Sequence, residues 1–286
     1  MNSDDFVVSV QIDPPATRKL NDFKRVMAIL LASGVRIVDV NSSRRISHDS
    51  IQLAVALAQM GFITIPHVTT RDSSLNGLLN QIFAAYEWGG VRDFLFITGD
   101  PYEASQSITP SRGIFQTDSI GAIEACDKYL RKDLKLQLDL TFYAAVNQNE
   151  ADLACEGERL KAKESAGADF FMSQPVFSKK QALCLFDFYE KHSKKPLLVG
   201  IWPLIHPKTI SSIHEKRIVG VCLDDETWAQ AARHTADQSK LQNWGLKRAY
   251  DLVEFICASK RAQGVYIVAP ARNPLILLDT LREMLS

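Results

Sequence analysis

The feature that most constrains the fold of this chain is a repeated alternation between two kinds of segment. Short runs rich in β-branched and aromatic residues are followed, along the whole chain, by longer stretches with apolar residues at three- and four-residue spacing. This alternation is typical of parallel strands joined by crossover helices. It predicts eight strands, at residues 6–12, 35–40, 62–66, 93–98, 137–143, 169–173, 196–200 and 265–268.

The periodicity between these runs predicts the helices. They are expected at residues 20–33, 50–59, 74–88, 119–131, 150–166, 179–192 and 243–259. Gly34, Gly61, Gly90 and Gly167 each stand between a helix and the next strand, where a left-handed helix cap favours glycine. The segment before the last strand has room for two or three helices, so its course is the least constrained.

Eight such units predict an α/β fold of one kind, a single (β/α)8 TIM barrel spanning residues 1–286. The length of 286 residues suits one barrel, whose usual size is about 250 residues. An open doubly wound sheet would show the same alternation, but no Gly-x-Gly-x-x-Gly follows the first strand and no Gly-x-x-x-x-Gly-Lys-Ser/Thr occurs. The closed barrel is therefore preferred.

The balance of charge argues against a nucleic-acid or membrane partner. Thirty-three Lys and Arg residues offset 33 Asp and Glu residues, so no net field attracts a polyanion. The first residues lack the basic and apolar regions of a signal peptide, and no apolar run reaches the ~18 residues of a membrane span. We therefore expect a cytoplasmic protein with a small-molecule partner. The five scattered cysteines indicate neither disulfides nor a zinc site, so no metal is predicted.

Functional residues are expected at the strand ends, because the loops there form the active site of such a barrel. In the first strand Ser9, Gln11 and Asp13 alternate onto the face that would point into the barrel mouth. Further candidates stand at or just after other predicted strand ends: they are Asn41, His67, Thr69, Gly99, Asp100, Asn147, Gln174 and Trp202.

Several of these residues have a plainer interpretation when taken alone. Asp13 and Asp100 each precede a proline and suit a turn. His67 suits a buried, hydrogen-bonded histidine, and Gln174 suits a helix cap. Their joint placement on one rim predicts a ligand site, but it does not name the ligand.

Motifs in this order identify a family. They are Val-Gln-Ile-Asp-Pro-Pro at 10–15, Pro-His-Val-Thr-Thr-Arg-Asp at 66–72, Ile-Thr-Gly-Asp-Pro at 97–101, Ser-Gln-Pro-Val-Phe at 173–177 and Gly-Ile-Trp-Pro-Leu at 200–204. Across nearly its whole length the chain resembles methylenetetrahydrofolate reductase. It is most similar to the subgroup that includes the reductase half of proteins fused to a homocysteine methyltransferase.

This resemblance implies a flavoprotein of one-carbon metabolism. Such an oxidoreductase holds FAD, takes hydride from NADH or NADPH, and interconverts 5,10-methylenetetrahydrofolate and 5-methyltetrahydrofolate. The resemblance implies a flavin site lined by His67, Thr69, Gly99, Asp100, Asn147, Glu156 and Lys163, with Asn41 and Arg45 as further candidates. It implies catalytic roles for Gln11, Asp100 and Gln174, and folate contacts from Gln11, Asp13, Gln174 and Trp202.

The chain departs from the family pattern at Gln11. A glutamate normally stands there and serves as the general acid when the folate ring opens. Glutamine has nearly the same shape but no acidic proton, and a positioned acid contributes about 100- to 10,000-fold in rate. We therefore expect altered proton handling. Asp13 lies on the same strand face as a substitute acid, although a displaced carboxylate need not reach the reacting nitrogen.

Two other functions stay open. One is a folate-dependent methyltransferase on the same barrel, which moves a methyl group between tetrahydrofolate and a corrinoid or thiol acceptor and needs no flavin. The other is a folate-binding partner protein without catalysis. Bound flavin separates the reductase from the methyltransferase, and turnover separates both from the third. The assembly is likewise open between a homo-oligomer and a complex with a methyltransferase partner protein.

Overall fold

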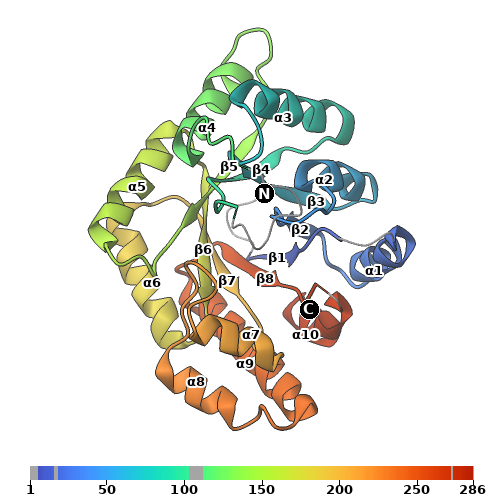
Figure 1. Cartoon of the computed structure of the whole chain (residues 1–286), viewed down its shortest axis with the longest axis vertical. Coiled ribbons are helices and arrows are strands. Elements are labelled where there is room, and N and C mark those ends of the chain that lie inside the picture. Colours follow the sequence, from blue (N-terminus) through green and yellow to red (C-terminus); the bar gives the residue numbers. More distant parts are fainter. Residues whose placement is uncertain (1–5, 16–18, 103–111, 272, 286) are drawn as a thin grey trace.

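The computed structural model describes residues 6–15, 19–102, 112–271 and 273–285. Its centre is a closed barrel of parallel strands in sequence order, in which β8 pairs with β1 (Figure 1). The strands are Val7–Ile12 (β1), Ile37–Val40 (β2), Ile63–Thr69 (β3), Asp93–Ile97 (β4), Thr141–Val146 (β5), Phe170–Val176 (β6), Leu197–Ile201 (β7) and Gly264–Val268 (β8). The predicted (β/α)8 TIM barrel is confirmed.

Helices surround the barrel (Figure 1). They are Leu20–Ala32 (α1), Ser50–Gln59 (α2), Leu75–Gly89 (α3), Ser119–Cys126 (α4), Leu153–Ala166 (α5), Lys179–His192 (α6), Pro207–His214 (α7), Asp225–Ala232 (α8), Gln238–Ser259 (α9) and Leu278–Leu285 (α10). Several begin after an Asp or Ser whose side chain accepts a hydrogen bond from a first-turn N–H, a stabilising cap. These capping residues are Asp49, Ser74, Asp118, Asp152, Ser178, Asp224 and Asp237.

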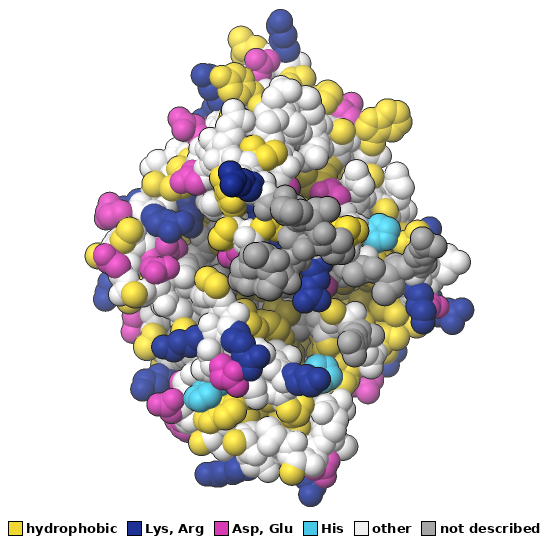
Figure 2. All heavy atoms as spheres, in the orientation of Figure 1, with side chains coloured by type: hydrophobic (Ala, Val, Ile, Leu, Met, Phe, Trp, Pro, Cys, Tyr) yellow, Lys and Arg dark blue, Asp and Glu magenta, His cyan; other side chains and the backbone are white. Residues whose placement is uncertain are grey.

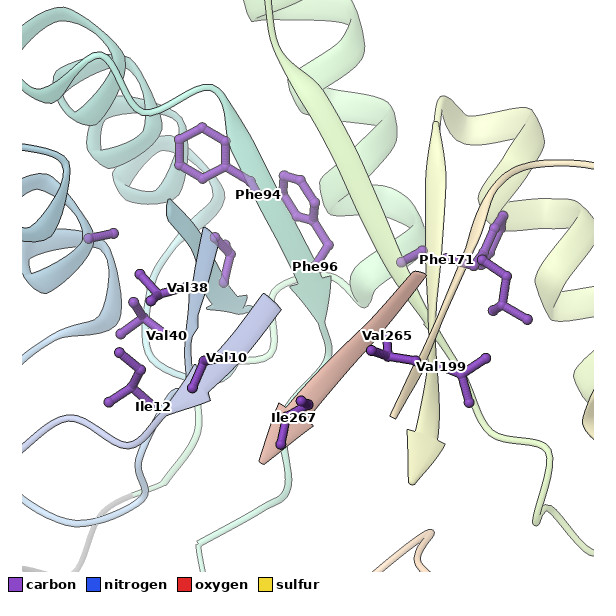
Figure 3. Close-up of a cluster of buried hydrophobic side chains, with 14 of the residues drawn as sticks. Val10, Ile12, Val38, Val40, Phe94, Phe96, Phe171, Val199, Val265 and Ile267 are labelled. Atoms are coloured by element: carbon purple, nitrogen blue, oxygen red, sulfur yellow. The ribbon is translucent and has the colours of Figure 1, made fainter. Parts of the chain in front are cut away.

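Alternation along the strands divides the apolar residues into two layers. Outward side chains such as Val10, Val38 and Phe94 pack in the large cluster between barrel and helices (Figure 3). Inward side chains fill the barrel itself: Val7, Ile65, Leu95, Tyr143, Met172, Leu198, Tyr266 and Val268. The interior is therefore a packed core, and a ligand can bind only at the rim formed by the strand ends.

All eight predicted strands are present, but the predicted start of the fifth was wrong. β5 begins at Thr141, whereas residues 137–143 were expected to form the strand. Leu136, Leu138 and Leu140 alternate with polar residues and mimic a strand pattern. Gln137, however, has a φ of 46°, which no strand accommodates, and the leucines lie in a loop after a π-helical turn, Asp127–Arg131 (η1).

The predicted glycine caps are confirmed, since Gly34, Gly61, Gly90 and Gly167 all have positive φ. Between β7 and β8 the chain forms α7, α8 and α9, the last of which contains the helix predicted at 243–259. α7 and α8 pack on an apolar cluster of their own, and a short 3-10 turn, Pro274–Leu277 (η2), precedes α10. No helix in the described ranges is long and apolar enough to cross a lipid bilayer.

Candidate active site at the C-terminal rim of the barrel

The residues predicted from the sequence lie around one end of the barrel. Because the strands are parallel, their C-terminal ends share one rim. Four of the residues belong to strands: Gln11 to β1, His67 and Thr69 to β3, and Gln174 to β6. Others stand within three residues after a strand: Asp13, Asn41, Gly99, Asp100, Asn147 and Trp202. Glu156 and Lys163 come from α5.

Beneath the rim, a buried network links the first three strands. Asp39 on β2 has no exposed surface, and its Oδ2 accepts a hydrogen bond from Ser9 Oγ at 2.7 Å. Its Oδ1 lies 3.2 Å from Nε2 of His67. The backbone oxygen of His67 accepts from Ser50 Oγ at 2.7 Å. Both carboxylate oxygens of Asp39 therefore have a donor, which a buried carboxylate requires.

Asp39 is a residue that the sequence prediction missed. Candidates were sought at strand ends, and Asp39 stands one residue before the end of β2. A signal was present, because Asp39 is the single acidic residue in the strand Ile37-Val38-Asp39-Val40. A lone carboxylate in an otherwise apolar strand needs partners inside the barrel.

Gln11 and Asp13 differ in how far they are engaged. Oδ1 of Asp13 accepts a hydrogen bond from Nδ2 of Asn41 at 2.9 Å, so the carboxylate considered as a substitute acid is tied to the next strand. The Gln11 side chain is half-buried and forms no hydrogen bond with any residue in the described ranges. None of these residues therefore competes with a ligand for its amide.

A buried arginine joins three rim loops. Arg71, only 2 % exposed, follows β3 and donates to the Asp72 carboxylate through Nη2 at 2.7 Å and through Nε. It also donates to the backbone oxygens of Ser43 at 3.2 Å and Asp100 at 3.3 Å. The Tyr102 ring lies 4.9 Å from the guanidinium. One side chain thus fixes the loops after β2, β3 and β4 relative to one another.

The Arg71–Asp72 pair is a clamp, and its ionisation fits that role. Burial opposes ionisation of Asp72, but hydrogen bonds from Arg71, Tyr102 and Thr69 outweigh burial and lower the pKa of that carboxyl. Burial likewise acts against the charged form of Arg71, yet the pairing with Asp72 raises its pKa. Both groups therefore stay charged and leave proton transfer to others.

The turn after β4 presents a carboxylate at the mouth. Gly99 has a φ of 84°, and an added Cβ would lie 3.3 Å from the Arg71 side chain, so this turn requires glycine. The Asp100 side chain that follows is 52 % exposed, and its Oδ2 lies 3.9 Å from Nη1 of Arg44. Arg44 is the neighbour of Arg45, the residue predicted from the motifs. Asp100 therefore presents an exposed carboxylate after β4, with a basic side chain close to it.

Glu156 and Lys163 lie under the rim and support β5. The Nζ of Lys163 donates to the Ala145 carbonyl at 2.6 Å, and Oε1 of Glu156 accepts from the Asn147 backbone N–H at 2.9 Å. The two charged groups are 3.8 Å apart and nearly fully buried. Burial lowers the pKa of Lys163, while Glu156 acts in the opposite direction. Their direct effect in this structure is to position Asn147.

Gln174 stands on a β-bulge in β6. The register of β6 against β7 shifts between Met172 and Pro175, and such a bulge changes the direction in which a side chain points. Gln148 fixes the backbone there, because its Nε2 donates to the Gln174 carbonyl at 2.8 Å and its Oε1 accepts from the Gln174 N–H at 3.0 Å. Gln174, which the motifs predict to contact the pterin, is therefore fixed in place through hydrogen bonds to its backbone.

The next two strands in the ring, β7 and β8, also hold this bulge in place. Oγ of Ser173 accepts from the Gly200 N–H at 3.1 Å, and the Tyr266 hydroxyl donates to the Ser173 carbonyl at 2.6 Å. Tyr266 has room only because residue 200 is glycine: an added Cβ would lie 2.6 Å from the tyrosine oxygen. β7 and β8 thus cooperate in placing Gln174.

The loop before α8 covers Gln174 from outside. Gly220 in this loop has a φ of 76°, and an added Cβ would lie 3.2 Å from Nε2 of Gln174 and 3.5 Å from Nδ2 of Asn147. Asn149 anchors the loop by donating to the Gly220 carbonyl at 2.8 Å. Trp202, the remaining candidate, is half-buried and packs against both the barrel interior and the cluster under α7 and α8.

An open groove lies on the outer side of the Gln174 bulge. It has a volume of ≈ 1660 Å³ and is lined by α6, α8 and α9, by Gln148 and Asn149 after β5, and by side chains of both charges. Basic and acidic side chains are also interspersed on the face shown in Figure 2. Within the described ranges, no three His, Cys, Asp or Glu side chains cluster closely enough to hold a metal ion. The convergence of polar groups, rather than cavity size, marks the rim as the candidate site.

The closed parallel barrel and its polar rim define a TIM-barrel protein of the class that binds ligands at the C-terminal face of the strands. Within that class the chain belongs to the methylenetetrahydrofolate reductase family, whose family model matches residues 1–277. The family predicted from the motifs is thereby confirmed. No curated protein matches the chain.

Solved structures show the same fold at low identity. An uncharacterized protein from Clostridium thermocellum that binds two copies of 5-methyl-5,6,7,8-tetrahydrofolic acid is 12% identical, with a TM-score of 0.69 over 99% of this chain and 96% of that chain. A 2,3-dimethylmalate lyase of the PEP mutase/isocitrate lyase superfamily is 13% identical, with a TM-score of 0.52 over 99% of this chain and 78% of that chain.

Proposed function

We propose that this protein is a flavin-dependent oxidoreductase that interconverts 5,10-methylenetetrahydrofolate and 5-methyltetrahydrofolate, with NADH or NADPH as the other substrate. The observation that carries the proposal is the arrangement of the rim in a chain whose family match covers residues 1–277. Asp100 is exposed after β4, and Gln174 is fixed on a bulge in β6, two strands further along the ring of strand ends. These are the positions at which the family handles flavin and pterin.

The rim has groups that fit a flavin. The isoalloxazine edge alternates ring N–H and carbonyl groups, so it needs both acceptors and donors. The exposed Asp100 carboxylate is an acceptor, and the turn at Gly99 has no side chain to keep a flat ring away from the backbone. The residues proposed to hold the cofactor are His67, Thr69, Gly99, Asp100 and Asn147. Bound FAD supplies the hydride chemistry.

The side chains of the rim position the reactants and set their charges. The negative charge of Asp100 favours departure of hydride from its vicinity, and the Gln174 amide orients the pterin. The Gln11 amide can donate a hydrogen bond to the folate, but it cannot release a proton to the nitrogen that leaves when the ring opens. Turnover by this protein therefore depends on another proton source, such as water.

A second function, folate binding without catalysis, is favoured because neither Gln11 nor Asp13 is suited to donate a proton. Gln11 has no acidic proton, and Asp13 is held by Asn41. A protein of the same fold binds 5-methyltetrahydrofolic acid, so the folate ligand is common to both proposals. The two differ in whether hydride moves.

Visible absorbance of the protein with FAD, recorded without oxygen, tests the proposal. The purified protein is supplied with FAD, and then with NADH or 5-methyltetrahydrofolate in separate experiments. Bleaching of bound flavin by either reductant is the expected result, and it identifies the half-reaction that survives Gln11. A protein that binds 5-methyltetrahydrofolate but no flavin would overturn the oxidoreductase proposal and favour methyl transfer or binding alone.

A further inference from the structure

The buried carboxylate of Asp39 has a geometry that goes beyond filling the barrel. Layers inside such barrels are usually filled by branched apolar side chains, and an ionised carboxylate is costly to bury. Asp39 nevertheless has no exposed surface, and it stands between Ser9 on β1 and His67 on β3. The interior below it is apolar, so Asp39 belongs to the layer directly under the rim.

The contacts of Asp39 define the tautomer of His67. An ionised carboxylate only accepts hydrogen bonds, so Nε2 of His67 must carry the proton that bridges the 3.2 Å to Oδ1. The nitrogen left without a proton in the neutral ring is then Nδ1. In the described ranges Nδ1 has no hydrogen-bond partner, so none of these residues competes with a ligand for its lone pair.

The groups around Asp39 do not compete with His67 for its Oδ1 atom. Among the described residues, Tyr266 on β8 is a further titratable group close to Asp39, and its hydroxyl donates to the Ser173 carbonyl at 2.6 Å. Ser9 occupies Oδ2, the second oxygen of the carboxylate. On β4, the residue in register with His67 is the apolar Leu95. Asp39 is therefore the group that orients the His67 ring.

We propose that Asp39 is a positioning residue of the ligand site: it holds His67 with Nε2 protonated, so that Nδ1 accepts a hydrogen bond from a ring N–H of the bound heterocycle. This inference rests on the proposed function, because a reduced pterin and an isoalloxazine both carry such a ring N–H. The shared chemistry is a flat heterocycle with an N–H donor on its edge.

Nitrogen-15 NMR of the histidine rings tests the tautomer in protein without cofactor. The His67 signals are assigned by their loss in His67→Gln, and the expected result is a single tautomer with the proton on Nε2. In Asp39→Asn the amide can present either its oxygen or its NH2 to the ring, so a mixture of tautomers is expected. Ser9→Ala, which removes only the contact to Oδ2, should keep the wild-type tautomer. A wild-type His67 that carries its proton on Nδ1 would overturn the proposal without any variant.

Binding measurements then identify the heterocycle. The affinities of wild type, Asp39→Asn and Ser9→Ala are measured separately for FAD and for 5-methyltetrahydrofolate. We expect Asp39→Asn to weaken one of them by about tenfold, and the ligand affected is the one that contacts Nδ1. Normal wild-type binding with both affinities unchanged in Asp39→Asn would overturn this inference alone. A wild type that binds neither ligand would instead overturn the proposed function.

Discussion

At position 11 the rim carries an amide where the family carries a carboxylic acid. The Gln11 side chain is half-buried and has no hydrogen-bond partner in the described ranges. A glutamate of nearly equal shape would therefore fit without displacing a hydrogen bond to any of these residues. The chemical difference is confined to one exchangeable proton, which makes this residue the sharpest place to test the proposed function.

We expect Gln11→Glu to increase the rate of folate reduction by about 100- to 10,000-fold, because it restores a positioned acid. Stopped-flow oxidation of the reduced flavin by 5,10-methylenetetrahydrofolate measures this rate. Gln11→Leu is the control, since it keeps the volume and supplies no proton. An unchanged rate in Gln11→Glu, with FAD and folate still bound, would contradict the prediction and place the defect elsewhere on the rim.

Which rim residues could be predicted depended on whether their role follows from the strand that carries them or from contacts between distant segments. Gln11, His67 and Asp100 could be found because a parallel strand pattern fixes where each strand ends. Asp39 could not be found in this way, because its role depends on a neighbour 28 residues away in sequence. The same holds for Arg71, whose role follows from which loops lie side by side and not from the residues next to it.

At the scale of elements, the bulge in β6 is an irregularity that places Gln174 in the candidate site. Pro175 follows the predicted end of this strand at residue 173 and is compatible with a bulge, but the sequence does not specify which neighbours hold it. The structure assigns that role to Gly200 on β7 and Tyr266 on β8. Two regular strands thus determine the direction of one side chain on a third.

We expect Gly200→Ala to lower the free energy of unfolding by about 1–3 kcal/mol, because the new methyl group overpacks the space of the Tyr266 hydroxyl. Affinity for 5-methyltetrahydrofolate should fall as well, since the bulge that carries Gln174 shifts. Urea unfolding and equilibrium titration measure the two effects. Tyr266→Phe removes the bond to Ser173 without added volume, so it should weaken folate binding with a smaller loss of stability. Unchanged stability and affinity in Gly200→Ala would rule out this coupling.

Elements differ in how well the sequence predicts them. α2 and α6 have the predicted bounds, because helical periodicity and an N-terminal cap agree there. The start of β5 was predicted wrongly because alternating leucines in a loop resemble a strand. α7 and α8 could not be resolved from the sequence, since their apolar residues pack on a cluster that exists only after the barrel has formed.

At the scale of the whole molecule, the end of the barrel opposite the site carries a half-buried acid. Burial raises the pKa of Asp93, at the start of β4, to about 6, although a hydrogen bond from Tyr143 acts in the opposite direction. The folded protein therefore binds this proton more tightly than the unfolded chain does. The stability that protonation provides is present at low pH and is lost as the pH rises through about 6.

We expect Asp93→Asn to stabilise the protein by up to about 2 kcal/mol above pH 7 and by much less near pH 4, since only the ionised aspartate is penalised by burial. Urea unfolding of variant and wild type at both pH values measures the difference. Asp22→Asn, which removes a charge from the exposed side of α1, is the control for net charge. A gain that is equal at the two pH values would contradict the assignment to Asp93.

The pairing of β8 with β1 has a consequence for synthesis. Until the last strand has left the ribosome, β1 and β7 each present an unpaired backbone edge, the kind of surface on which nascent chains aggregate. The site has contributions from β1 through β8, so no partial translation product can assemble it. Ligand binding can thus begin only after the ring is complete, and a bound ligand would then hold the first and last strands together against reopening.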